Sequence, residues 1–259
     1  MNCARHPDRP TGVTCQRCGK PICADCMVSA PVGYHCQDCQ RRGGQKIRTV
    51  RSLYNQPVAT RALVVANVVA FIAAQVFNLD PDGWLTVRQV ADGEWWRLIT
   101  SAFLHAGLLH LAFNMWALFL WGEAIEARLG TARFLGLYAV SLASGSLGVV
   151  ALTNPGTPTV GASGAIFGLM GVLIAVQRYH NIDIWRSGLG GVMVLNLVFT
   201  FVGANISIGG HLGGFLGGLI AGGLLMVNKS DSRTQTAALV LSTILLLGLA
   251  VIVAQSRWG

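Results

Sequence analysis

The sequence has few charged residues and long apolar runs. Only 12% of its 259 residues are charged, while 53% are hydrophobic and the mean hydropathy is +0.53. A soluble domain carries about 25% charged residues, so a water-soluble enzyme built around one large core is excluded. The apolar content equally excludes a disordered chain, which cannot bury enough surface to offset its ordering entropy. We therefore expect most of this protein to lie in a membrane.

Cysteine is confined to the first 39 residues, and basic residues are concentrated near it. All seven cysteines lie between Cys3 and Cys39, and residues 1–61 contain ten basic and three acidic residues. Residues 62–259 contain nine basic and eight acidic residues. This asymmetry predicts three parts: a small cytosolic zinc-binding domain over residues 1–45, a basic juxtamembrane linker over 46–61 and a membrane domain over 62–254.

Four ligand pairs, each with two intervening residues, fill the N-terminal domain: Cys3/His6, Cys15/Cys18, Cys23/Cys26 and Cys36/Cys39. This gap lets one tight turn present two ligands to one ion, and structural zinc takes four N or S ligands. Eight ligands predict two closed structural Zn²⁺ sites, with metal binding supplying folding energy. The odd number of cysteines, and an expected lack of a cleavable signal peptide, disfavour a disulfide framework. His35 is an alternative ligand in place of Cys36 or Cys39.

The N-terminal domain resembles a B-box-type zinc finger. The resemblance implies cross-bracing, in which Cys3, His6, Cys23 and Cys26 bind one ion and Cys15, Cys18, Cys36 and Cys39 bind the other. We expect this domain to tune access or to recruit a cytosolic protein partner. Nucleic-acid binding is disfavoured because metal-bound thiolates offset much of the positive charge. Most of the remaining basic residues precede the first apolar run, where they suit anionic lipid.

Seven apolar segments, each close to the ~20 residues that cross a bilayer, follow the linker. They cover residues 62–78, 102–122, 132–152, 163–180, 188–204, 206–227 and 236–254. These runs predict an all-α membrane protein with a seven-helix bundle. The expected segments contain no acidic residue, which disfavours a proton pump or a cation channel. We detect no internal repeat, which disfavours a transporter.

The distribution of basic residues predicts the orientation in the membrane. Residues 41–61 include six basic residues and no acidic one, whereas the loop over 79–101 includes four acidic residues. The positive-inside rule then places the N-terminus in the cytoplasm, a reducing compartment in which cysteines bind zinc. We expect a multi-pass protein of a bacterial plasma membrane.

Polar side chains recur near the same end of three segments. His110 and Asn114 lie in the second segment, Ser163 begins the fourth, and His211 lies near the start of the sixth. A lone serine would usually only pack between helices. Serine, histidine and asparagine at one depth instead predict a functional site. Its serine–histidine pair would lack the carboxylate that completes a catalytic triad.

These motifs resemble those of the rhomboid family of intramembrane serine proteases. Gly161-Ala162-Ser163-Gly164 resembles the family's GxSG motif, and His211 with Gly214 and Gly218 resembles its HxxGxxxG motif. His110 with Asn114 resembles the family's HxxxN motif. Trp96-Arg97 resembles the tryptophan–arginine pair in the family's first loop. The resemblance covers residues 62–254, and the seventh segment is similar to the six-plus-one variant.

The resemblance implies a serine endopeptidase with no cofactor for catalysis. Ser163 would be the nucleophile and His211 the general base. We expect the oxyanion to be bound by the backbone N–H of Ser163 and by the side chains of His110 and Asn114. Phe167, one turn after Ser163, is expected to pack on the His211 ring. Three glycines should support the site by allowing close backbone approach: Gly161, Gly164 and Gly214.

The expected partners are single-span transmembrane protein substrates and the lipid bilayer, with the active site opening toward the outer face. The fifth segment and the loop over 203–207 are candidates for a lateral gate. The main alternative is a catalytically silent rhomboid-like adaptor that binds transmembrane clients. The presence of both Ser163 and His211 disfavours this alternative.

Overall fold

The computed structural model describes residues 1–43, 56–77, 83–202 and 206–258. The chain divides into two compact units, Met1–Tyr54 and Asn55–Gly259. Residues 46–55 of the expected linker, and residues 203–205 of the expected gate, lie outside the described residues.

The N-terminal unit is built around its cysteines. It contains the 3₁₀ helix η1 (Ala24–Cys26), the strands β1 (Met27–Ser29) and β2 (Tyr34–Cys36), and the helix α1 (Gln37–Arg42). The two strands form an antiparallel hairpin. The buried core consists of Ile22 with Cys3, Cys15, Cys23, Cys26 and Cys36. So little aliphatic surface cannot stabilise a domain by itself, and small domains of this kind need a metal or another cross-link.

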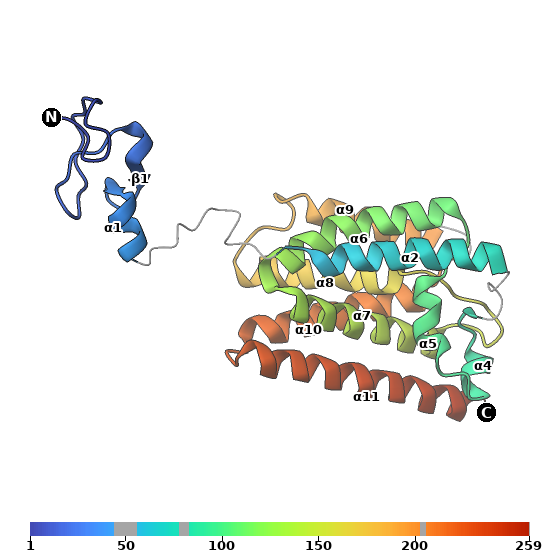
Figure 1. Ribbon diagram of the computed structural model, residues 1–259. Coiled ribbons are helices and arrows are strands. Elements are labelled where there is room, and N and C mark those ends of the chain that lie inside the picture. The colour runs from blue at the N-terminus through green and yellow to red at the C-terminus, as the bar shows by residue number, and fades with distance from the viewer. Residues whose placement is uncertain (44–55, 78–82, 203–205, 259) are drawn as a thin grey trace. The chain divides into compact units, whose positions relative to one another are not determined.

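The second unit is a bundle of apolar helices (Figure 1). Its principal helices are α2 (Val58–Phe77), α6 (Leu108–Leu129), α7 (Thr131–Leu152), α8 (Ser163–Tyr179), α9 (Leu189–Val202), α10 (Ile208–Val227) and α11 (Ser232–Trp258). Five of these, α2, α6, α7, α10 and α11, are long and apolar enough to cross a membrane, and α8 and α9 are shorter apolar helices. These helices correspond to the seven predicted segments.

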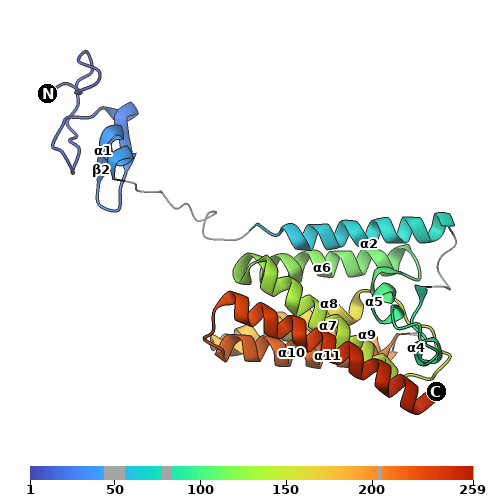
Figure 2. The ribbon, with the colours of Figure 1, turned by 60° about the horizontal axis from the view of Figure 1, so that its bottom comes forward.

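Helix α8 forms the centre of the bundle. Its residues from Ala165 to Ala175 are all buried, and α7 and α10 pack against it (Figure 2). The outer helices α2 and α11 bury far less of their apolar surface within the protein. Their exposed side chains are suited to lipid, in which an apolar surface costs no hydration free energy.

The second predicted segment is shifted from the observed helix. Residues 102–107 precede the helix, and part of them belongs to the 3₁₀ helix η3 (Ser101–Phe103). Helix α6 also continues seven residues beyond the expected end at 122, so Glu123 and Glu126 lie within it. The predicted end of this segment is therefore wrong, and the observed helix carries two acidic residues that the predicted segment did not include.

Glu126 is fully buried and accepts hydrogen bonds from two other helices. Its carboxylate accepts bonds from the backbone N–H of Ala59 at 2.9 Å and of Thr60 at 2.7 Å. The hydroxyls of Thr60 and Thr131 donate to it at 2.7 and 2.8 Å. The first N–H groups of a helix lack intrahelical acceptors, so Glu126 satisfies the start of α2. This role was not predictable from the sequence, because Ala59 and Thr60 lie 67 and 66 residues from Glu126.

The loop between α2 and α6 contains α4 (Val87–Ala91) and α5 (Arg97–Thr100). Arg97 is buried, forms an ion pair with Glu94 at 2.6 Å and donates to the Trp84 carbonyl at 2.8 Å. A buried arginine needs such partners. Arg97 thereby anchors the first loop through Glu94 and Trp84.

Candidate active site

Ser163 and His211 lie in direct contact, although 48 residues separate them in the sequence. Ser163 is the first residue of α8, and His211 is the fourth residue of α10. The Nε2 atom of His211 lies 2.8 Å from Ser163 Oγ. This distance lies within the hydrogen-bond reach that an activated nucleophile and its base would require. Both residues lie at helix N-terminal ends, so their side chains meet at one end of the bundle.

Glycines bring the two helices close enough for this contact. A Cβ atom added at Gly214 would collide with the Gly164 carbonyl, and one added at Gly218 would collide with the Gly168 carbonyl. The backbones of α8 and α10 are therefore in van der Waals contact, as small residues at helix interfaces permit. A larger residue at either position would push Ser163 and His211 apart.

The ring of Phe167 stacks on the ring of His211. Their centroids lie 4.0 Å apart, with an angle of 15° between the planes. Phe167 is one turn beyond Ser163 on α8 and is buried. The stack restricts rotation of the imidazole about its side-chain bonds, which fixes the direction of Nε2.

The turn before Ser163 requires glycine at position 161. Gly161 has a φ of 116°, and its N–H donates to the Ser101 carbonyl at 2.9 Å. A Cβ atom there would lie 2.7 Å from Cε1 and 2.8 Å from Nε2 of His110. The His110 ring is thus placed directly against the turn that presents Ser163.

The hydrogen bond at Nδ1 of His110 determines which of its ring nitrogens carries the proton. The backbone N–H of Ala106 donates to His110 Nδ1 at 3.4 Å. A neutral imidazole that accepts at Nδ1 carries its proton at Nε2. His110 therefore presents an N–H donor beside Gly161.

Unlike the His110 ring, the Asn114 side chain forms its hydrogen bond within α6. Asn114 is buried, and its side-chain amide donates to the His110 carbonyl at 2.8 Å, within α6 itself. One further amide N–H remains for another acceptor. His110 thus lies against the Ser163 turn, whereas Asn114 lies one helical turn further along α6.

A cavity of about 30 Å³ lies beside the serine–histidine pair. Ser163, His211, Gly161, Ser101 and Ser207 are among its lining residues. One water molecule needs roughly 10–15 Å³ of such space and two to four polar partners. The site has room and hydrogen-bonding groups for one or two water molecules.

Two further residues contact the site. The hydroxyl of Thr200, on α9, lies 2.8 Å from His211 Nδ1. Its only signal in the sequence was a threonine within an apolar segment, and no motif singled it out. The His105 ring packs edge-on against His110 at a centroid distance of 5.1 Å.

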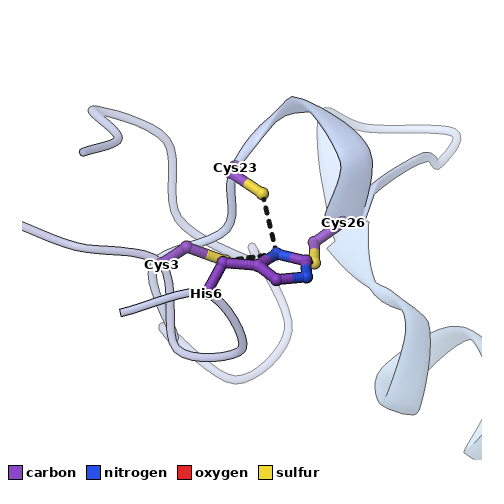
Figure 3. Close-up of side chains that lie close together, drawn as sticks. All are labelled: Cys3, His6, Cys23 and Cys26. Carbon is purple, nitrogen blue, oxygen red and sulfur yellow. Dashed lines mark hydrogen bonds between the residues drawn. The ribbon is translucent and has the colours of Figure 1, made fainter. Parts of the chain in front are cut away.

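The cysteines and His6 of the N-terminal unit form two clusters. One comprises Cys3, His6, Cys23 and Cys26, and the other Cys15, Cys18, Cys36 and Cys39. This is the cross-braced grouping that the B-box resemblance implies. Figure 3 shows the side chains of the first cluster converging on one point. His35 belongs to neither cluster in the described part of the chain.

The dimensions of the clusters suit tetrahedral zinc. His6 Nδ1 lies 3.3, 3.4 and 4.0 Å from the sulfurs of Cys23, Cys26 and Cys3. The sulfurs of Cys18 and Cys36 lie 3.7 Å apart. An ion about 2.3 Å from each sulfur and about 2.0 Å from the nitrogen requires ligand–ligand separations of about 3.5–3.8 Å. The observed separations fall around these values.

Without a cation, each cluster would ionise only in part. Hydrogen bonds outweigh burial at Cys3 and at Cys15 and lower the pKa of each thiol to about 6, whereas other thiols of the clusters resist ionisation. Burial and hydrogen bonds with Cys3 and Cys23 raise the pKa of the Cys26 thiol to about 11. A hydrogen bond with Cys18 and burial raise the pKa of Cys39 to about 12. Like charges held this close oppose each other's ionisation. A divalent cation bound among them would reverse this preference, since zinc binds the thiolate form.

The bundle and the cysteine-rich unit together define a multi-pass membrane protein with a small zinc-finger domain. A rhomboid domain family model matches residues 92–228, and a B-box zinc finger model matches residues 1–31. The chain belongs to the rhomboid family. Cys36 and Cys39 lie beyond the residues that the B-box model matches.

Named relatives include two proteins of Bacillus subtilis (strain 168). "Putative rhomboid protease YdcA" is 41% identical over 151 residues, which cover 56% of this chain and 73% of YdcA. "Rhomboid protease GluP" is 40% identical over 167 residues, which cover 62% of this chain and 32% of GluP. "RHOMBOID-like protein 5" of Arabidopsis thaliana is 38% identical over 128 residues, covering 49% of this chain and 40% of the plant protein. This chain thus spans only about a third of GluP.

Proposed function

We propose that this protein is an intramembrane serine endopeptidase that cleaves transmembrane segments of membrane proteins. The observation that carries the proposal is the 2.8 Å contact between Ser163 Oγ and His211 Nε2. Family membership and the protease names of its relatives support the same reaction class.

In this mechanism His211 removes the hydroxyl proton as Ser163 Oγ attacks the scissile carbonyl carbon. The new C–O bond gives a tetrahedral oxyanion, and His211 then protonates the leaving amine as the C–N bond breaks. A water molecule, deprotonated by the same imidazole, attacks the acyl-enzyme and releases the carboxyl product and free Ser163. The cavity beside the pair supports this second step because hydrolysis requires water inside the bundle.

The oxyanion would be stabilised by donors arranged before the reaction begins. Ser163 offers its backbone N–H, because the first residue of a helix has no intrahelical acceptor for it. His110 offers Nε2–H from beside Gly161. We assign Asn114 a third contact through its remaining amide N–H.

Basic residues support a site that opens toward the outer face. Ser163 and His211 lie at N-terminal helix ends, while Arg128 and Arg178 lie in the last turns of α6 and α8. The positive-inside rule assigns the ends with arginine to the cytoplasm. The N-terminal domain, with two structural Zn²⁺ ions, would then be cytoplasmic and available to a protein partner.

The substrate would be a single-span transmembrane protein that unwinds near its outer end. A hydrogen-bonded helix shields its carbonyl groups, so residues that weaken the helix should favour cleavage. Helix α9 carries exposed apolar side chains, including Val192, Leu195 and Val198, and packs only sparsely against α10. This sparse packing supports α9 as the helix beside which substrate enters.

The proposal is tested by cleavage of a single-span model substrate in proteoliposomes. Wild type, Ser163→Ala and His211→Ala are compared, with thermal unfolding used to show that each variant is folded. Loss of cleavage in both variants supports the proposal. Equal cleavage by all three would contradict it, and client binding without cleavage by wild type would favour the adaptor alternative.

A further inference from the structure

Thr200 is buried near the end of α9, whereas the middle of this helix is largely exposed; Leu189 and Gly190, at its start, are buried as well. Val192, Val194, Leu195 and Val198 of α9 are each at least 40% exposed, whereas Thr200 is only 2% exposed. Its hydroxyl lies 2.8 Å from His211 Nδ1 and 2.8 Å from the Asn196 carbonyl oxygen. The buried hydroxyl thus connects the imidazole to the backbone of α9.

The two contacts determine where the protons lie. A threonine hydroxyl has one proton to donate and two lone pairs to accept with. A carbonyl oxygen can only accept, so the contact with Asn196 requires Thr200 to donate there, as threonine hydroxyls in helices often do. The hydroxyl must then accept from His211, which places a proton on Nδ1 and leaves Nε2 as the acceptor for Ser163.

This arrangement is the one that a general base requires. A histidine with its proton on Nε2 would donate to Ser163 and could not remove the serine proton. In a serine–histidine–aspartate triad, a carboxylate at Nδ1 selects the correct tautomer, and its replacement by an amide lowers kcat about 10⁴-fold. No Asp or Glu carboxylate is recorded in contact with His211 among the described residues, and Thr200 occupies that position.

We propose that Thr200 is a positioning residue that holds His211 in the Nδ1–H tautomer. This inference rests on the proposed function for its kinetic consequences, but the tautomer itself can be observed without activity. Ser163 and His211 lie on α8 and α10, whereas Thr200 lies on α9. Full activity would therefore require that α9 is also correctly placed.

Thr200→Val tests the proposal, because valine keeps the branched shape and removes the hydroxyl. Thr200→Ser restores a hydroxyl. The matched control is Thr243→Val on α11, where the hydroxyl also donates to a carbonyl four residues earlier, at 2.9 Å from Leu239 O. All are reconstituted as full-length protein in proteoliposomes.

We expect Thr200→Val to lower kcat about 10–100-fold with little change in KM, since a neutral acceptor contributes less than a carboxylate. The rate of fluorophosphonate labelling at Ser163 should fall by a similar factor. For Thr200→Ser and Thr243→Val, both kcat and the labelling rate should remain within about 3-fold of the wild-type values. A 3-fold change corresponds to less than about 0.7 kcal/mol. Unchanged kcat and labelling in folded Thr200→Val would overturn the proposal.

The ¹⁵N chemical shifts of the His211 ring provide the independent test. The signals are assigned by comparison with His211→Ala in histidine-labelled protein. We expect the Nδ1–H form in wild type and a mixture of tautomers in Thr200→Val. A predominant Nε2–H form in wild type would overturn the proposal even if Thr200→Val failed to fold. By contrast, cleavage by Ser163→Ala at the wild-type rate would contradict the proposed function and leave the tautomer measurement valid.

Discussion

At the scale of single residues, Gly161 links the backbone turn to the His110 side chain. Gly161→Ala would place a methyl group within 2.8 Å of the His110 ring at a φ of 116°. We expect about a 100-fold lower kcat because displacing one oxyanion donor costs a factor of this order. Cleavage of the model substrate measures the effect.

The matched control for this substitution is Gly156→Ala in the same loop. A Cβ atom at Gly156 meets nothing within 4 Å. Its activity should match wild type. An unaltered rate in Gly161→Ala would show that His110 does not take part in oxyanion binding.

Single-residue patterns predicted Ser163, His211, His110 and Phe167 as parts of one site. Each carries a side chain whose chemistry or spacing is informative by itself. Thr200 could not be identified in this way because a threonine in a helix usually bonds only its own backbone. Its second contact, with His211, exists only after α9 and α10 have packed.

At the scale of helices, the contact between α8 and α10 depends on glycine. Gly214→Ala would drive a methyl group into the Gly164 carbonyl. Overpacking of this kind costs about 1–3 kcal/mol, and the separation of Ser163 from His211 should also lower activity. Thermal unfolding in detergent measures the stability, with Gly223→Ala as the control because its Cβ meets nothing within 4 Å. Equal losses in the two variants would contradict tight packing at Gly214.

The buried carboxylate at the end of α6 connects three helices. Glu126→Gln should destabilise the bundle by about 1–3 kcal/mol, because the N–H groups of Ala59 and Thr60 lose a charged acceptor. Glu123→Gln is the control, since Glu123 forms an exposed ion pair with Arg61 at 3.0 Å, and such pairs contribute about 0–1 kcal/mol. Unfolding midpoints in detergent compare the two. A smaller effect at Glu126 than at Glu123 would contradict this account.

The helices themselves were largely predictable because apolar runs of membrane length leave few alternatives. The start of α6 was not, since residues 102–107 are apolar enough to continue a helix. The residue before them is held instead by the loop between α7 and α8, where the Gly161 N–H donates to the Ser101 carbonyl. The predicted second segment also ended before Glu126, because the apolar run stops there. The residues that bind the buried Glu126 carboxylate could not be identified from the sequence.

At the scale of the whole molecule, zinc binding should depend on pH. The thiols of Cys26 and Cys39 have raised pKa values of about 11 and about 12 in the metal-free clusters. Zinc must displace their protons, so lower pH weakens binding, by up to about 10-fold per pH unit for each proton released. Competition with a zinc indicator in the full-length protein, at about pH 8 and about pH 6, measures this. Equal affinity at the two pH values would contradict thiolate ligation.

The zinc domain and the membrane bundle should fulfil separable roles. Replacing Cys15 and Cys18 with serine should abolish binding of one zinc ion per chain, since two of four ligands are lost. Cleavage of a generic model substrate should stay within about 3-fold of wild type, because the residues that line the Ser163 cavity belong to the bundle. Loss of cleavage in a variant whose bundle remains folded would contradict the separation.

We expect Ser163 to be a nucleophile that His211 activates inside the membrane. Labelling with a fluorophosphonate, followed by mass spectrometry of the modified peptide, tests it most directly because it needs no knowledge of the substrate. We predict a single adduct on Ser163 in wild type and none in folded His211→Ala. An adduct on another residue, or equal labelling of Ser163 without His211, would contradict the account.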